Sequence, residues 1–298
     1  MSTTHRTPAV EAVPGVVAAP TATTPGAGPA PGRPRRVRRP HIGTGLGLGT
    51  AVLYLSLIVL IPLGAVVLRG TGKGPAYFWR AVTTPDAWAA LKLTVGLALL
   101  VALVNLVMGT VIAWVLVRDS FPGKAVVDML IDLPFALPTV VAGLVLLALY
   151  GAQSPLHVSL AYSRAGVFVA LLFVTLPFVV RTVQPVLLEF DRDMEQAAHS
   201  LGASPATTFR RVVLPNLLPA MVSGAGLAFV RAIAEYGSTN MISGNLPGKT
   251  QVAAVVIYGR VEGDSTVDAA AISTFLLGVA LVVLLLLEIV QRWRSRHG

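Results

Sequence analysis

Charged side chains within apolar stretches are the first residues of this sequence whose types and spacing could do chemistry. Arg231 and Glu235 lie four residues apart, so a helix would place both on one face. If that stretch spans a membrane, an unpaired charge at its centre costs at least roughly 3 kcal/mol, which favours a mutual ion pair that faces other helices. Two interpretations of the pair remain: an element of a transport pathway or gate, or a structural ion pair.

Arg181 and Gln184 are a second polar pair in an apolar stretch. A cation at Arg181 could attract an oxyanion, although a permanent tight site would slow release of the anion. The pair therefore allows the same two interpretations, a pathway element or a structural contact. Lys92 and Glu288 lie near the ends of apolar stretches, where long side chains reach the polar interface, so neither predicts a site.

Residue types needed for catalysis or metal binding do not occur in a usable pattern. The sequence has no cysteine, which excludes disulfides, thiol nucleophiles and cysteine-ligated metals. No histidine pair has metal-ligand spacing, and no nucleophile is matched with a base. Residues 244–250 read GNLPGKT, with three residues between the first glycine and the Gly-Lys pair where a phosphate-binding loop needs four. We predict no catalytic residue, no metal site and no bound cofactor in this chain.

Residues 191–215, DRDMEQAAHSLGASPATTFRRVVLP, are organised as two short helices with a break between them. Asp191 can cap the first helix, and Gly202 can adopt the left-handed conformation that ends it. Ser204 can cap a second helix that has Pro205 at its first position. We call residues 191–215 the elbow.

The first helix of the elbow has an apolar face with small residues at its centre. Met194, Ala197, Ala198 and Leu201 fall on this face at helical spacing. Such a helix can lie close in a groove on another protein. An amphipathic helix that rests on a bilayer surface has the same pattern, so the residues leave both interpretations open.

The composition indicates that lipid is the main solvent of this chain. Of its 298 residues, 54% are hydrophobic and 12% are charged, and the mean hydropathy is +0.74. A soluble domain usually has about 25% charged residues. Backbone polar groups have no water partner in lipid, so we predict an all-α membrane protein with six transmembrane helices. Each spans about 30 Å of hydrocarbon with about 20 residues, and the segments are residues 46–68, 91–117, 127–150, 167–188, 217–242 and 269–290.

Prolines occur in the third, fourth and fifth predicted spans. Proline removes a backbone donor and bends a helix, and in transporters such breaks often line a cavity. Packing kinks are the equally plain interpretation, because membrane helices tolerate them. The prolines concerned are Pro134, Pro138, Pro177, Pro185 and Pro219.

The distribution of basic residues predicts the orientation. With an internal N-terminus, thirteen basic residues fall inside: Arg33, Arg35, Arg36, Arg38, Arg39, Arg118, Lys124, Arg192, Arg210, Arg211, Arg292, Arg294 and Arg296. Six fall outside: Arg69, Lys73, Arg80, Arg164, Lys249 and Arg260. This bias predicts a multi-pass protein with both termini in the cytoplasm. We expect residues 1–42 to be a disordered cytoplasmic tail, residues 43–293 the membrane domain and residues 294–298 a basic tail.

The net charge of +9 therefore indicates contact with membrane lipid, and we expect no nucleic-acid partner.

The elbow resembles the EAA loop of bacterial ABC-importer permeases. The resemblance rests on Ala197-Ala198, Gly202 and Leu214-Pro215 at the family's spacing, before the fifth of six spans. In that family the loop fits a cleft on the ATPase and transmits its closure. Gln196 occupies the position where the family usually has glutamate, and Glu195 directly precedes it. The resemblance thus implies ATPase-coupling residues Glu195, Gln196, Ala197, Ala198, Gly202, Leu214 and Pro215.

Further segments narrow the resemblance to the sulfate/thiosulfate permeases, over residues 91–293. They are DLPFALPTVVAGL (132–144), LPFVVRTVQPVL (176–187) and AEYGSTNMISGNLPGKTQ (234–251), and FALPTVVAGL is more similar to the T-type subunit than to its W-type partner. The resemblance implies a type I ABC-importer permease bundle (MetI-like) in the bacterial cytoplasmic membrane. It also implies a second, W-type permease subunit, ATPase subunits that use ATP and Mg, and an extracytoplasmic sulfate/thiosulfate-binding protein.

Three alternatives stay open. Molybdate/tungstate permeases share the elbow and the general plan of the chain. An ion-coupled secondary anion transporter could use Arg231 and Glu235 as a proton relay, but it leaves the elbow unexplained. A membrane-embedded hydrolase would need a nucleophile and a base within the spans, and the sequence offers no such pair.

Overall fold

The structure is a computed structural model that describes residues 42–295. Most of the predicted N-terminal tail, with Arg33, Arg35, Arg36, Arg38 and Arg39, lies outside the described residues, as does Arg296. The chain divides into two compact units between Leu53 and Tyr54. The described part of the first unit is most of the apolar helix α1, and all packing contacts described below lie within the second unit.

Every regular element in the described part of the chain is helical. The elements are α1 (Ile42–Leu55), the π-helical turn η1 (Ser56–Leu60), α2 (Ile61–Thr71), α3 (Pro75–Val82), α4 (Pro85–Arg118), α5 (Lys124–Ala136), α6 (Thr139–Tyr150), α7 (Arg164–Glu189), α8 (Asp193–Ser200), α9 (Pro205–Thr208), the π-helical turn η2 (Phe209–Val213), α10 (Leu214–Ile233), α11 (Gly237–Ile242), α12 (Ala253–Glu262) and α13 (Thr266–Ser295).

Five helical segments within residues 42–295 are long and apolar enough to cross a membrane. They are Gly47–Thr71, Pro85–Arg118, Arg164–Glu189, Pro205–Ile233 and Thr266–Ile289. The pair α5 and α6, bent by 117°, is a sixth if it counts as one span. The chain is thus an all-helical membrane protein, as predicted.

The third predicted span, residues 127–150, is not one helix. α5 ends at Ala136, and Leu137 is extended with φ −89° and ψ 135°. Pro138 disfavours the helical conformation for the residue before it, and Leu137 adopts the extended alternative, so the chain turns at this position. Pro134, by contrast, lies inside α5. One proline therefore breaks the segment and the other does not.

The fifth predicted span, residues 217–242, also divides. α10 ends at Ile233, and α11 begins only at Gly237 and packs on α6. A Cβ on Gly143 of α6 would lie 2.7 Å from the carbonyl oxygen of Ser238, and a Cβ on Gly237 would lie 2.8 Å from the amide nitrogen of Val140. Because only glycine permits this approach, the two short helices pack backbone against backbone.

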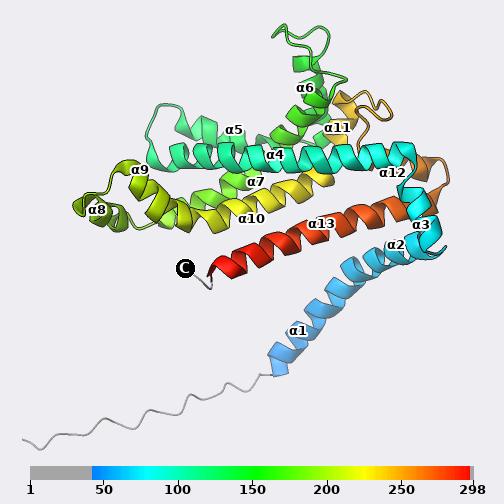
Figure 1. The fold of residues 1–298 in the computed structure, drawn as a ribbon, viewed down its shortest axis with the longest axis horizontal. Coiled ribbons are helices and arrows are strands. Elements are labelled where there is room, and N and C mark those ends of the chain that lie inside the picture. The colour runs from blue at the N-terminus through cyan, green and yellow to red at the C-terminus, as the bar shows by residue number, and fades with distance from the viewer. Residues whose placement is uncertain (1–41, 296–298) are drawn as a thin grey trace, which may run out of the picture. The chain divides into compact units, whose positions relative to one another are not determined.

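The core is built by α4, α7 and α10, which lie side by side in Figure 1. Val179 of α7 is fully buried where the three helices meet. A Cβ on Gly109 of α4 would lie 2.8 Å from the Cβ of Val179, and one on Gly224 of α10 would lie 2.9 Å from its Cα. The amide of Asn105 also donates a buried hydrogen bond of 2.8 Å to the hydroxyl of Thr175.

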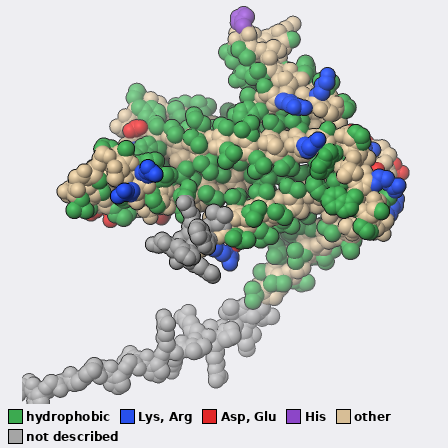
Figure 2. All heavy atoms as spheres, in the orientation of Figure 1, with side chains coloured by type: hydrophobic (Ala, Val, Ile, Leu, Met, Phe, Trp, Pro, Cys, Tyr) green, Lys and Arg blue, Asp and Glu red, His purple; other side chains and the backbone are tan. Residues whose placement is uncertain are grey.

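The outer surfaces of the long helices carry large apolar side chains. On α4, Leu103 and Val107 are more than half exposed, and on α13 Leu285 and Leu286 are as well. Hydrophobic side chains cover much of the face drawn in Figure 2. Such a surface is suited to hydrocarbon and to partner helices rather than to water.

Candidate functional site

The first half of the elbow is the helix α8, which follows α7 (Figure 1). The carboxylate of Asp191 accepts a 2.9 Å hydrogen bond from the amide of Asp193, the first residue of α8, although the N-cap position itself belongs to Arg192, one residue later than predicted. Gly202 ends the helix with a φ of 82°, and the amide of Ala203 donates to the carbonyl oxygen of Ala198 at 3.0 Å. The left-handed glycine is therefore confirmed.

The second half of the elbow is continuous with the next span. The hydroxyl of Ser204 accepts a hydrogen bond from the amide of Thr207, and Pro205 begins a helix that runs without interruption to Ile233. Sequence reasoning had placed the start of the span at residue 217. The second half of the elbow is therefore the start of one continuous helix, Pro205–Ile233, which continues into the bundle and which we call the rod.

Leu214 and Pro215 lie where this rod changes its hydrogen-bond pattern. Pro215 has no N–H to give to the preceding turn, and residues Phe209–Val213 form a π-helical turn there. The amide of Leu214 donates to the carbonyl oxygen of Phe209, and the side-chain amide of Asn216 donates to that of Val212 at 2.6 Å. The proline thus shifts the helical register without ending the helix.

The apolar face predicted for α8 is largely uncovered. Leu201 is 89% exposed and Met194 is 42% exposed. Gln196 and Ala197 are also exposed, and Ala198 is half-buried. A leucine of this exposure beside small residues provides an apolar surface that another protein can cover.

Glu195 points the other way, into the bundle. Its carboxylate forms an ion pair with the guanidinium of Arg118, the last residue of α4. The side chains of Arg118 and Glu195 are 11% and 21% exposed, so the pair is shielded from solvent. Sequence reasoning assigned Arg118 only to the count of basic residues and missed this contact.

Aromatic rings hold the Arg118 guanidinium in place. Its central carbon lies 5.0 Å from the ring centroid of Trp114 and 5.8 Å from that of Phe190. Trp114 in turn makes an edge contact with Phe209 of η2, with centroids 5.5 Å apart. The cluster of Trp114, Arg118, Phe190 and Phe209 thus joins the ends of α4 and α7 to both halves of the elbow.

Arg181 is engaged by carboxylates. Its guanidinium binds both oxygens of Asp132 at 2.7 and 2.6 Å, and it binds the carboxylate and the carbonyl oxygen of Asp128 at 2.8 Å each. The fifth N–H donates to Gln184 at 2.6 Å, so all five donors are used. Asp128 and Asp132 lie four residues apart in the third predicted span, a signal that sequence reasoning missed.

Arg231 and Glu235 pair directly, at 2.5 Å. Glu235 is 2% exposed, and its second oxygen accepts hydrogen bonds of 2.8 Å from the amide and the hydroxyl of Ser238. The carboxylate therefore caps the first turn of α11 while Arg231 compensates its charge.

The GNLPGKT segment forms a closed loop after a helix. The hydroxyl of Thr250 donates to the carbonyl oxygen of Ser243 at 2.6 Å and accepts from the amide of Leu246. α12 begins three residues later, at Ala253, so Lys249 and Thr250 do not start a helix as they would in a phosphate loop. Within residues 42–295, no cluster of three or more His, Asp and Glu residues could hold a metal ion.

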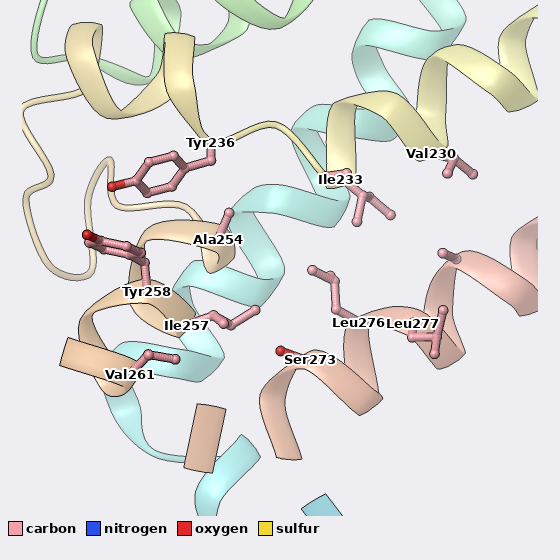
Figure 3. A pocket seen from close by; sticks show the side chains of 12 residues that line it. Val230, Ile233, Tyr236, Ala254, Ile257, Tyr258, Val261, Ser273, Leu276 and Leu277 are labelled. Carbon is pink, nitrogen blue, oxygen red and sulfur yellow. The ribbon is translucent and has the colours of Figure 1, made fainter. Parts of the chain in front are cut away.

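A cavity of about 500 Å³ lies between α10, α12 and α13 (Figure 3). Tyr236 and Tyr258 lie at one end of it with ring centroids 5.2 Å apart, and Ile233, Ile257 and Leu276 line much of the rest. None of its lining residues is charged. The cavity therefore provides no compensation for an oxyanion.

Comparison with known sequences gives matches over most of the chain. The family model described as binding-protein-dependent transport system inner membrane component matches residues 105–296. The sulfate transport system permease protein CysT of Synechocystis sp. is 45% identical over 254 residues, covering 83% of this chain and 89% of that protein. The protein of the same name from Salmonella typhimurium is 40% identical over 268 residues, covering 88% and 96%.

Solved structures share the fold at low sequence identity. A chain of the bacterial alginate ABC transporter, crystallised with an alginate-pentasaccharide-bound periplasmic protein, has a TM-score of 0.66 and 16% identity, with 82% of this chain and 91% of that chain covered. A chain of the MetNI methionine ABC transporter in an inward-facing conformation has a TM-score of 0.54 and 16% identity, with 69% and 94% covered.

Proposed function

The chain belongs to the family of binding-protein-dependent transport system inner membrane components, and from that premise we propose that it is a permease subunit of an ATP-driven sulfate importer. The relatives that are 40–45% identical over at least 80% of the chain are named sulfate transport permeases. The observation that carries the proposal within the molecule is the elbow, because its outer face is exposed and its far end continues into a span. Thiosulfate is the second anion that this proposal includes.

In the proposed mechanism, the elbow docks in the cytoplasm on an ATPase subunit. Leu201, Gln196 and Ala197 supply the contact surface, and closure of the ATPase moves α8. Gly202 fixes the angle between α8 and the rod from Pro205 to Ile233, so the displacement passes into the bundle. ATP and Mg belong to the partner, and this chain is a non-catalytic subunit.

Two arginines in the spans, Arg181 and Arg231, are already paired with groups of this chain. In the described part of the chain, Arg181 uses all its donors on protein groups and Arg231 is paired with a buried carboxylate. Neither offers a free cation for a dianion. We propose that an extracytoplasmic binding protein supplies affinity and that a second, W-type permease subunit completes the pore, with both termini of this chain in the cytoplasm.

Uptake by the assembled complex tests the proposal. Proteoliposomes that hold this chain, the second permease and the ATPase should import labelled sulfate when the binding protein and ATP are supplied, and vanadate should stop import. Import that ignores vanadate would point to a secondary transporter instead. Import of molybdate without sulfate would replace the substrate with molybdate or tungstate, and the ATP-driven mechanism would stand.

A further inference from the structure

In the described part of the chain, one side-chain ion pair joins the coupling helix α8 to a spanning helix. None of its residues is fully buried. Among the described residues, its other polar side-chain contacts stay within the elbow, such as Ser200 with the carbonyl oxygen of Gln196. Within residues 42–295, the Glu195–Arg118 pair is thus the one hydrogen-bonded side-chain contact between α8 and a spanning helix.

The surroundings of Arg118 hold its side chain in one position. Its side chain is 11% exposed, and the rings of Trp114 and Phe190 flank the guanidinium. The planar guanidinium of an arginine can interact with aromatic rings, and its fixed geometry orients it more than the flexible ammonium of a lysine would be oriented. The Nε of Arg118 is buried and has no hydrogen-bond acceptor in the described part of the chain. Its terminal nitrogen forms the ion pair with Glu195.

We infer that Arg118 is a positioning residue of the transport cycle that links the coupling helix to α4. This inference rests on the function proposed above. A push on α8 reaches α10 through the chain at Gly202, and it reaches the end of α4 through the Arg118–Glu195 pair. Because α8 also follows α7 directly in the chain, the pair adds α4 to the two core helices that the chain already connects to α8, and without the pair α4 loses its ion-pair link to the coupling helix.

The inference also gives Glu195 a defined role. Gln196 occupies the family's usual acidic position and is exposed, so it is available to contact the ATPase in the proposed complex. Glu195 faces inward and does not replace that acidic contact. In this proposal Gln196 contacts the ATPase, and Glu195 binds Arg118 at the end of α4.

The test measures sulfate imported per ATP hydrolysed by the complete complex. Arg118→Gln and Glu195→Gln should each lower this ratio by on the order of tenfold, within the range of known coupling energies, while the ATPase stays bound and continues to hydrolyse ATP. The double variant should be no worse than either single variant, because both remove the same contact. Arg118→Lys keeps the cation and should recover part of the ratio.

The matched control is a second ion pair at the other end of α4. Arg260 of α12 binds Asp86 at 2.7 Å, with side chains 30% and 39% exposed. Arg260→Gln and Asp86→Asn also break an ion pair to α4, and they should leave the ratio unchanged. A ratio that falls equally in the controls would show a general loss of stability and overturn the inference.

Further outcomes separate this inference from the function on which it rests. If the wild-type complex imports no sulfate, the proposed function fails, whatever the variants do. If the wild-type complex imports sulfate and Arg118→Gln lowers only the melting temperature, the inference is overturned. Should Arg118→Gln fail to assemble, Arg118→Lys and Glu195→Asp decide the question: an intermediate ratio supports the link, and an unchanged ratio overturns it.

Discussion

At the scale of single residues, Gly202 acts through its backbone alone. Its φ is 82°, and a Cβ at this position would meet no atom within 4 Å. The cost of a side chain here is therefore conformational rather than steric, about 1–2 kcal/mol for an ordinary L residue. Asparagine reaches the left-handed region more readily than most residues, which makes it a matched substitution.

We expect Gly202→Val to uncouple ATP hydrolysis from sulfate import and Gly202→Asn to retain most of the coupling. Valine is β-branched and disfavours positive φ, so α8 and the rod would meet at a different angle. ATPase activity and labelled-sulfate uptake, measured on the same proteoliposomes, give the coupling ratio. Equal coupling in the two variants would rule out the backbone angle as the reason for the glycine.

Glu235 allows a second residue-scale prediction. Glu235→Ala should destabilise the protein by about 3–5 kcal/mol, because it leaves Arg231 uncompensated and removes the cap of α11. Glu235→Gln keeps an acceptor for Ser238 and should cost less. Thermal unfolding of the purified complex in detergent measures both.

The same variants separate a structural pair from a proton relay. A relay predicts that Glu235→Gln abolishes transport at unchanged stability, since glutamine carries no titratable proton. The ion pair and the two Ser238 hydrogen bonds favour the structural role, in which transport and stability fall together.

At the scale of elements, the crossing of α6 and α11 is a close packing that sequence reasoning did not foresee. The two segments had been assigned to the ends of the third and fifth spans. Pro138 separates α6 from α5, and the carboxylate of Glu235 caps the first turn of α11 after α10 has ended. Gly143 and Gly237 allow the backbones of α6 and α11 to approach each other closely. Proline signalled a bend, but the contact joins residues almost a hundred positions apart, which no local pattern reports.

We expect Gly143→Ala to cost about 1–3 kcal/mol, because its methyl group would lie 2.7 Å from the carbonyl oxygen of Ser238. Gly278→Ala on α13 is the control, since a Cβ there meets nothing within 4 Å. Helix propensity predicts that the control is neutral or stabilising by up to about 1 kcal/mol. Equal loss of thermal stability in both variants would contradict the close approach.

The elbow shows why some elements could be predicted in detail. A glycine and a Ser-Pro pair are local signals, and Gly202 and Ser204 adopt the predicted roles. The partners of Arg118 and Arg181 could not be predicted in this way. Their carboxylates are 77 and about 50 residues distant in sequence, so only the packed bundle brings them together.

At the scale of the whole molecule, composition alone predicts the helical membrane class, because lipid permits few alternatives for the backbone. Span boundaries were less predictable. The helix that contains the fifth span begins twelve residues before the predicted start, at Pro205, since the polar second half of the elbow extends the same helix. Hydropathy marks where lipid begins, and hydrogen bonding decides where a helix begins.

The orientation can be tested because the natural sequence has no cysteine. Leu201→Cys introduces one thiol at an 89% exposed position. In right-side-out vesicles a membrane-impermeant maleimide should not label this thiol. In inverted vesicles the maleimide should label the thiol unless the ATPase is bound. Labelling from the outside would place the elbow on the wrong side for a partner that uses cytoplasmic ATP.

The crossing of α4, α7 and α10 gives the rod from Pro205 to Ile233 a fulcrum. Gly224 meets Val179 there, nineteen residues after Pro205 and nine before Ile233. At 1.5 Å per residue the two arms are about 29 Å and about 14 Å long. If the helix pivots here as a rigid lever, its two ends move in opposite directions, and the displacement of the shorter arm is about half that of the longer arm. If closure of the ATPase moves the elbow as proposed, opening at the elbow end closes the opposite end, and the longer arm gives the ATPase mechanical advantage over the other side.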